Sequence, residues 1–93
     1  MSTLANQQEY QLPVAGQPYL VLRSTVNRVG LLVCNANSSG IVYMVWGAPN
    51  TSAGVPLYPN EKRLMDVVTP TDALYMYGQN ANALVIIEEC TKQ

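Results

Sequence analysis

Histidine and phenylalanine are absent from these 93 residues, and charged side chains are scarce. Without histidine, the chain lacks the commonest general base and cannot form a Ser-His or Cys-His nucleophile pair. The six carboxylates do not replace it. Glu88 and Glu89 are adjacent, so on a strand they point to opposite faces, and Asp66 and Asp72 flank a turn. We therefore expect a protein that is not an enzyme.

Cofactor and metal motifs are also missing. No glycine-rich phosphate cradle occurs, and two cysteines without histidine do not make a structural zinc site. Asn35, Asn37 and Ser38 have no carboxylate near them in the sequence, as a calcium site would require. These residue types are typical of turns instead. We expect no cofactor and no metal.

Cysteine and long apolar runs are rare as well. Cys34 and Cys90 each lie in an apolar segment, and we interpret them as reduced, buried thiols. A cross-strand disulfide remains the alternative, although a reducing compartment disfavours it. Residues 1–17 lack the basic start and apolar run of a secretory signal, and no segment reaches the roughly 18 apolar residues of a membrane span. We expect synthesis in a cytoplasm.

The low charge limits the partners. Asp, Glu, Lys and Arg make up 12% of the chain, against about 25% in ordinary soluble domains. The five basic residues are spread along the chain, so neither nucleic acid nor a membrane surface is an expected partner. Because a free monomer normally carries more charge, the 48% apolar content suggests that other subunits cover part of the surface.

Short β-rich segments, separated by turn residues every 10–12 positions, dominate what is present. This spacing predicts an all-β fold, a small antiparallel β-sandwich or jelly-roll-like barrel of about six to eight short strands. We expect strands at 18–23, 29–35, 41–46, 62–68, 73–77 and 83–90, and a proline-fixed turn at 55–59.

Residues 1–17 are polar and show no period. We interpret them as an extended N-terminal arm, with a short strand at 10–12, in front of a single β-sandwich domain at 18–93. The arm either frays in solution or crosses to a neighbouring subunit.

Several expected strands are apolar on both faces, which one small sandwich cannot easily cover. In 41–46, Ile41, Tyr43 and Val45 alternate with three further apolar residues. Exposed apolar faces favour oligomerisation or docking, although a tightly wrapped sandwich remains the alternative. Tyrosine and tryptophan suit half-wet interfaces, and together with asparagine they could also form a sugar-stacking platform. The candidate assembly contacts are Tyr10, Leu12, Tyr43, Trp46, Leu57 and Tyr58.

Four segments between about residues 29 and 89 resemble a pattern of small virion proteins of tailed bacteriophages. They are 35–43 (NANSSGIVY), 54–61 (GVPLYPNE), 72–77 (DALYMY) and 83–88 (ALVIIE). The chain has Asn60 where the pattern favours glycine, and both residues tolerate a positive φ.

The resemblance implies a non-enzymatic structural role, most simply that of a capsid decoration, or cement, protein. Such a protein binds across neighbouring capsid subunits and stabilises the head. Its partner would be the major capsid protein or another virion protein, its place the virion, and its form a homo-oligomer, with a trimer favoured by analogy. The alternatives are a carbohydrate- or protein-binding module of a phage tail, fibre or head-fibre assembly, and a free-standing monomeric β domain.

Overall fold

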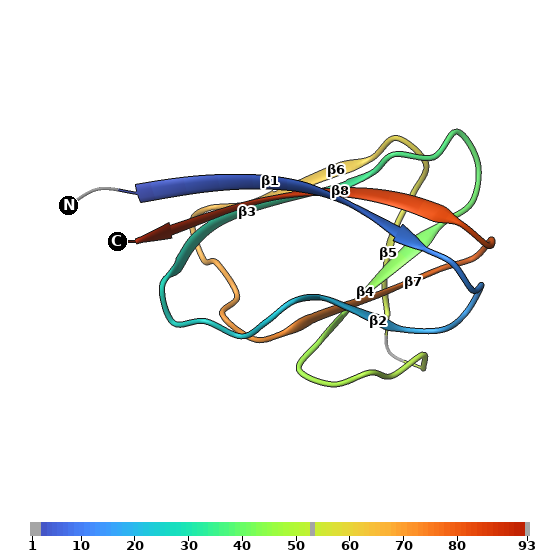
Figure 1. The fold of residues 1–93 in the computed structure, drawn as a ribbon, viewed down its shortest axis with the longest axis horizontal. Coiled ribbons are helices and arrows are strands. Elements are labelled where there is room, and N and C mark those ends of the chain that lie inside the picture. Colours follow the sequence, from blue (N-terminus) through green and yellow to red (C-terminus); the bar gives the residue numbers. More distant parts are fainter. Residues whose placement is uncertain (1–2, 53, 93) are drawn as a thin grey trace.

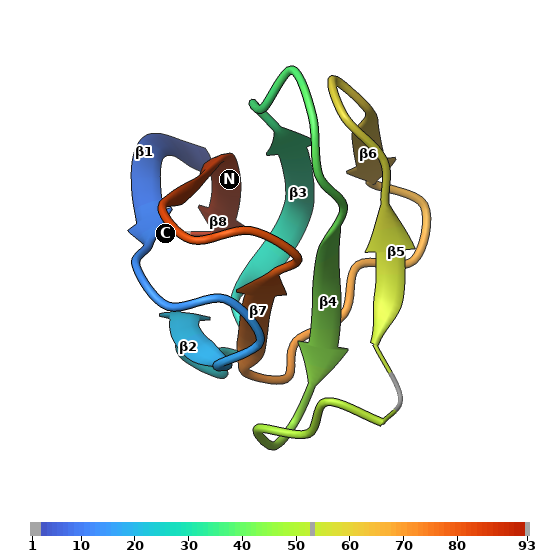
Figure 2. The ribbon, with the colours of Figure 1, turned by 90° about the vertical axis from the view of Figure 1, so that its right-hand side faces the viewer.

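The protein is a sandwich of two antiparallel four-stranded sheets (Figure 1). A computed structural model describes residues 3–52 and 54–92 and contains no helix within them. Sheet A has the strand order β1-β8-β3-β6 and sheet B the order β2-β7-β4-β5 (Figure 2). The strands are β1 (Thr3–Leu12), β2 (Tyr19–Leu22), β3 (Arg28–Asn35), β4 (Val42–Trp46), β5 (Val55–Leu57), β6 (Lys62–Met65), β7 (Leu74–Gly78) and β8 (Ala83–Lys92).

The topology is that of a long hairpin rolled up on itself. β1 pairs with β8, β2 with β7, β3 with β6 and β4 with β5, so the first half of the chain lies antiparallel to the second half. Pairing of β3 with β8 and of β4 with β7 then closes the two sheets. Eight strands in this order are a jelly roll, and the predicted fold class is confirmed.

The core forms where the alternating side chains of both sheets meet. Along β8 the residues Ala83, Val85 and Ile87 are buried, while the residues between them are half-buried on the outer face. Complete burial of such a side chain contributes about 1.5–3 kcal/mol. The fully buried core also contains Leu12, Leu31, Val33, Val42, Met44, Leu57, Leu74 and Met76.

Residues 55–59, expected as a turn, begin with the short strand β5. Its three residues pair with β4, from Val55↔Met44 to Leu57↔Val42. Proline is acceptable here because β5 is an edge strand, where the missing N–H of Pro56 faces away from the ladder. The turn itself follows, at Tyr58–Glu61. Asn60 has φ 62°, and the Glu61 N–H donates to the Tyr58 carbonyl at 2.9 Å.

Of the expected N-terminal arm (1–17), residues 3–12 form the edge strand of sheet A, and residues 1–2 lie outside the described residues. β1 pairs with β8 without interruption, from Thr3↔Lys92 to Leu12↔Ala83. Its sequence lacks an apolar period because residues 4–9 are exposed, whereas Leu12 is 1% exposed in the core. The division at residue 17 therefore needs correction, since residues 3–12 belong to the sandwich.

Deleting residues 1–12 should lower the melting temperature clearly. The deletion removes a core leucine and exposes one edge of β8, and burying a leucine alone contributes about 1.5–3 kcal/mol. Thermal unfolding followed by circular dichroism measures the effect. A melting temperature unchanged from that of the full chain would mean that the segment behaves as a free arm.

A β-bulge in β3 places one cation inside the sandwich. Arg28 pairs with Thr91 and Gly30 with Cys90, so Val29 is an extra residue opposite β8. A shift of one residue reverses which face a side chain occupies. Because of it, Arg28 points to the inner side, and its side chain is fully buried.

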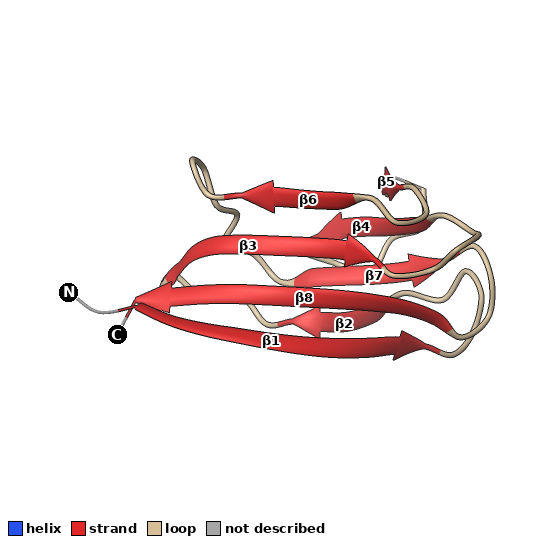
Figure 3. Ribbon diagram, turned by 90° about the horizontal axis from the view of Figure 1, so that it is seen from above, coloured by secondary structure: helices blue, strands red, loops and turns tan. Residues whose placement is uncertain are grey.

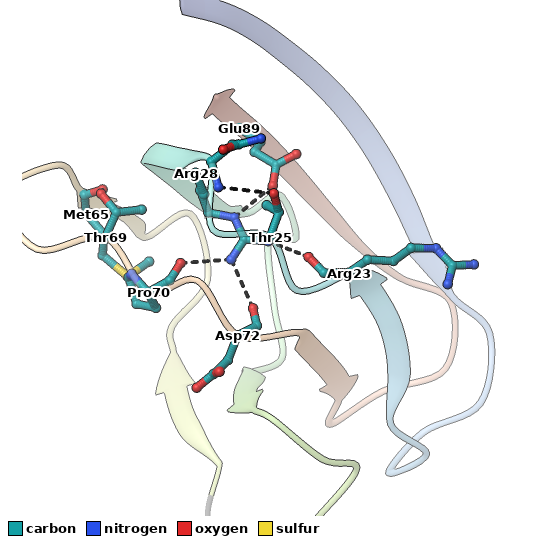
Figure 4. A network of polar contacts seen from close by, with 9 residues as sticks. Arg23, Thr25, Arg28, Met65, Thr69, Pro70, Asp72 and Glu89 are labelled. Carbon is teal, nitrogen blue, oxygen red and sulfur yellow. Dashed lines mark hydrogen bonds and ion pairs between the residues drawn. The ribbon is translucent and has the colours of Figure 1, made fainter. Parts of the chain in front are cut away.

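The guanidinium of Arg28 ties together the crossovers at this end of the sandwich (Figure 4). Nε contacts the Glu89 carboxylate at 2.7 Å, and Nη1 donates to the carbonyls of Pro70 and Asp72 at 2.8 and 2.9 Å. Nη2 donates to the Arg23 carbonyl at 2.7 Å. The two segments that cross between the sheets here, β2 to β3 and β6 to β7, are thus held by one side chain and by Glu89 of β8.

Replacing Arg28 with alanine should cost about 3–5 kcal/mol of unfolding free energy, because it leaves Glu89 without its charge partner and orphans three carbonyls. Urea unfolding followed by Trp46 fluorescence measures this. Arg63→Ala is the control, since Arg63 is partly exposed and lies 3.9 Å from Glu61, a geometry worth about 0–1 kcal/mol. Equal losses for both variants would contradict the structural role of Arg28.

Candidate functional site

The outer face of sheet A carries an apolar strip across three strands. Register places Leu32 of β3 beside Leu64 of β6, and Cys34 of β3 beside Ile86 of β8. Leu64 is 63% exposed, and the other members are half-buried. Figure 3 looks onto this sheet, with β1 along one edge. The apolar strip consists of Leu32, Cys34, Leu64, Leu84, Ile86 and Cys90.

Polar residues border the strip, and Glu88 lies between Ile86 and Cys90 on the outer face of β8. Glu88 lies next to Leu32 in the ladder, Glu9 next to Ile86, and Lys62 next to Cys34. An apolar surface with a polar border is typical of protein–protein contacts. Cys34 and Cys90 are both free thiols. The strip is therefore an apolar surface that carries two free thiols.

Part of the outer face of sheet B, at Tyr43 and Tyr77, is covered by the chain itself. Tyr43 and Tyr77 stack with ring centroids 4.8 Å apart and planes 13° apart, and the Tyr77 hydroxyl donates to the Thr51 carbonyl at 2.9 Å. A Cβ at Gly54 would collide with both tyrosines, so glycine lets the loop after β4 lie against them. Burial, and secondarily the nearby Tyr43, raises the pKa of Tyr77. Tyr77 is thus not available to stack on a sugar.

The asparagine-rich turn after β3 is bordered by a cavity of about 360 Å³, but its amides are engaged internally. Asn35 is 0% exposed and donates through Nδ2 to the carbonyls of Gly40 and Leu57, at 3.0 and 2.9 Å. Asn37 accepts the Leu84 N–H at 2.9 Å and donates to the Leu84 carbonyl at 2.9 Å, as a further strand residue would. These amides connect the turn before β4, the end of β5 and the start of β8, at the end of the sandwich opposite Arg28.

A second cavity, of about 400 Å³, lies on the open flank of the sandwich below β1. Tyr10 of β1 and Glu89 of β8 line it from sheet A, and Arg23 lines it from the segment after β2. Burial, and secondarily the Glu89 carboxylate, raises the pKa of Tyr10, so the phenol stays neutral.

Metal-binding and membrane-spanning features were also sought. Residues 3–52 and 54–92 contain no group of three His, Cys, Asp or Glu side chains that could hold a metal ion. No helix long and apolar enough to cross a membrane occurs in this part of the chain.

The six predicted contact residues occupy different environments. Leu12 and Leu57 are 1% and 0% exposed in the core, so both are corrected to core residues with no surface for a partner. Trp46 packs partly buried against the core, and Tyr10 does so on the open flank.

The remaining two predicted contacts lie far from the apolar strip. Tyr43 lies on the covered outer face of sheet B, and Tyr58 is 55% exposed at the corner after β5. Sequence reasoning did not select Leu32, Leu64 or Ile86. The two-sided apolar pattern of 29–35 and 83–90 was the signal that could have identified Leu32 and Ile86, whereas β6, with Lys62 and Arg63, gave no such signal for Leu64.

No family model matches the chain, and no curated protein matches it. Among solved structures it is similar to a chain from Bacillus endospore appendages, which are described as a novel family of disulfide-linked pili. The two chains share a fold. The alignment covers 98% of this chain and 88% of the other, with a TM-score of 0.57 and 8% sequence identity. At this identity the likeness concerns the fold alone.

Asn35→Asp should destabilise the protein by about 2–6 kcal/mol, because the ionised side chain cannot donate to the Gly40 and Leu57 carbonyls, and each orphaned buried group costs about 1–3 kcal/mol. Urea unfolding measures the change. Asn50→Asp is the matched control, since its exposed Oδ1 only accepts hydrogen bonds, which a carboxylate also does. A similar small effect for both would contradict the structural role of Asn35.

Proposed function

We propose that this chain is a non-enzymatic structural protein that docks onto a larger assembly through the outer face of sheet A. The observation that carries the proposal is the apolar strip, which crosses β6, β3 and β8 and has polar residues along its border. A monomer in water gains nothing from Leu64 at 63% exposure, whereas a partner surface that covers it removes apolar area from water.

We further propose that the assembly is a virion and that the chain decorates its capsid, in contact with the major capsid protein. Two arguments support this: the resemblance of residues 29–89 to small phage virion proteins, and the use of the same fold in a pilus-forming protein. On this proposal the protein is made in the host cytoplasm and ends in the particle.

The carbohydrate-binding alternative is weaker because the stacked pair Tyr43 and Tyr77 does not form an open platform. Tyr77 is 8% exposed beneath the loop after β4, and its ring is stacked on that of Tyr43, so the stacked faces of the two rings are not free for a sugar. Purified protein should therefore bind empty capsids and leave a glycan array unlabelled. Binding to glycans without binding to capsids would reject the capsid proposal.

Leu64→Glu should weaken capsid binding by about tenfold or more, because it places a charge on the face that must lose water. Cosedimentation with empty capsids over a range of concentrations measures the affinity. Val67→Glu is the control, since Val67 is 94% exposed in the connection after β6 and lies off the strip.

Both variants should melt like the parent protein. Equal affinities for Leu64→Glu and the parent would show that sheet A does not face the capsid. In that case protection of Cys34 and Cys90 from alkylation in the complex would also be absent.

A further inference from the structure

The four edges of the two sheets differ in how well they are protected. An open strand edge presents unpaired N–H and C=O groups, and proteins commonly block such edges with short strands, prolines, bulges or lysines. β6 has four residues, including Lys62 and Arg63. β5 has three residues, including Pro56, and β2 has four residues and a register shift between Leu20 and Leu22.

β1 has none of these protections. It has ten residues and pairs with β8 without a register shift. It contains no proline and no lysine, and its single charged residue is Glu9. Residues 4–9 are exposed, which leaves the outward backbone groups open over most of the strand.

The same flank is open below the strand. The cavity of about 400 Å³ reaches the inner face of β1 at Asn6, Gln8 and Tyr10. Leu4, which lies on the same face by alternation, is 52% exposed. Figure 2 shows β1 and β2 at this side of the sandwich, joined by the segment between them. An unpaired edge and an uncovered apolar side chain thus coincide.

We propose that the β1 edge binds the β1 edge of a second copy of this chain, antiparallel and about a two-fold axis at Gln7. Sheet A then continues across the dimer as one eight-stranded sheet. In this register Gln7 faces Gln7, Gln8 faces Asn6, Glu9 faces Ala5 and Tyr10 faces Leu4. Odd residues meet odd residues and even meet even, so inner side chains stay opposite inner side chains.

The residue pairs formed in this register favour a second copy of the chain as the partner of the β1 edge. Glu9 meets Ala5, so no like charges lie opposite each other, and the Tyr10 ring covers the exposed Leu4, an aromatic–aliphatic cross-strand pair. Amide side chains along the axis can hydrogen-bond to one another. In this register residues 3–11 of one copy pair with residues 11–3 of the other, which is nine residues, whereas pairing of β1 with the edge strand β6 in a head-to-tail arrangement would use four. The inference therefore favours a two-fold dimer over the trimer implied by the resemblance.

The dimer does not depend on a capsid or on the apolar strip, and its test uses purified full-length protein alone. Sedimentation equilibrium at low salt should give the mass of two chains, falling to one on dilution. A monomer at all concentrations, or the mass of three chains, would overturn the proposal.

Charge at the axis tests the register. Gln7→Lys puts two lysines opposite each other and should raise the dimer dissociation constant by about tenfold or more at low salt. Within its own chain the new lysine lies beside Glu88, so the fold keeps its stability. Gln11→Lys is the matched control, because it adds the same charge on the same strand and face but meets Thr3 of the partner.

Gln7→Glu should also weaken the homodimer, and because the new carboxylate lies beside Glu88 of its own chain, its melting temperature is compared with that of the parent. Mixing the two Gln7 variants should restore dimers with one chain of each kind. Loss of dimers in Gln11→Lys as severe as in Gln7→Lys, or failure of the mixture to dimerise, would reject the register. These measurements use no capsid. Failure of the capsid-binding proposal would therefore not contradict the dimer, and absence of the dimer would not contradict the capsid-binding proposal.

Discussion

The β3 bulge and the cation that it turns inward are the constraint on which the closure of the sandwich depends. A rolled hairpin must cross from one sheet to the other several times, and each crossing carries backbone carbonyls that cannot all join a ladder. At one end Arg28 supplies the donors for three of them while Glu89 balances its charge. A planar guanidinium suits this task because its N–H groups point in several fixed directions.

At the opposite end of the sandwich, neutral side chains form the hydrogen bonds to the backbone groups of the crossing segments. Asn35 and Asn37 combine donor and acceptor groups, and this allows two amides to serve the turns before β4 and β6 and the start of β8. The two ends together explain how a chain with few charged residues leaves no buried side-chain N or O atom without a hydrogen-bond partner among those described. Polar side chains are concentrated where the backbone needs them.

The strands were predictable because β-rich segments and turn residues alternate along the chain. Val42–Trp46 and Ala83–Lys92 lie close to the expected ranges. Asn60 at a positive φ was also predictable, from the residues that tolerate that conformation. Arg28 was not, since a one-residue bulge reverses its face and no local pattern marks the bulge. β1 was missed because an exposed edge strand has no apolar face to produce a period, and its partner β8 lies at the other end of the chain.

The two sheets differ in their charged residues and in the apolar surface and strand edge that they leave exposed. The strands of sheet B contain no charged residue, and on its tyrosine-rich outer face Gly54 lies against Tyr43 and Tyr77. Sheet A instead mixes an apolar strip with charged neighbours, and it keeps one long edge open. A charged border permits solubility before assembly and still leaves apolar area for a partner to cover. The two proposed contacts of sheet A, through the apolar strip and through the β1 edge, lie on different strands and meet only near Glu9, which pairs with Ile86.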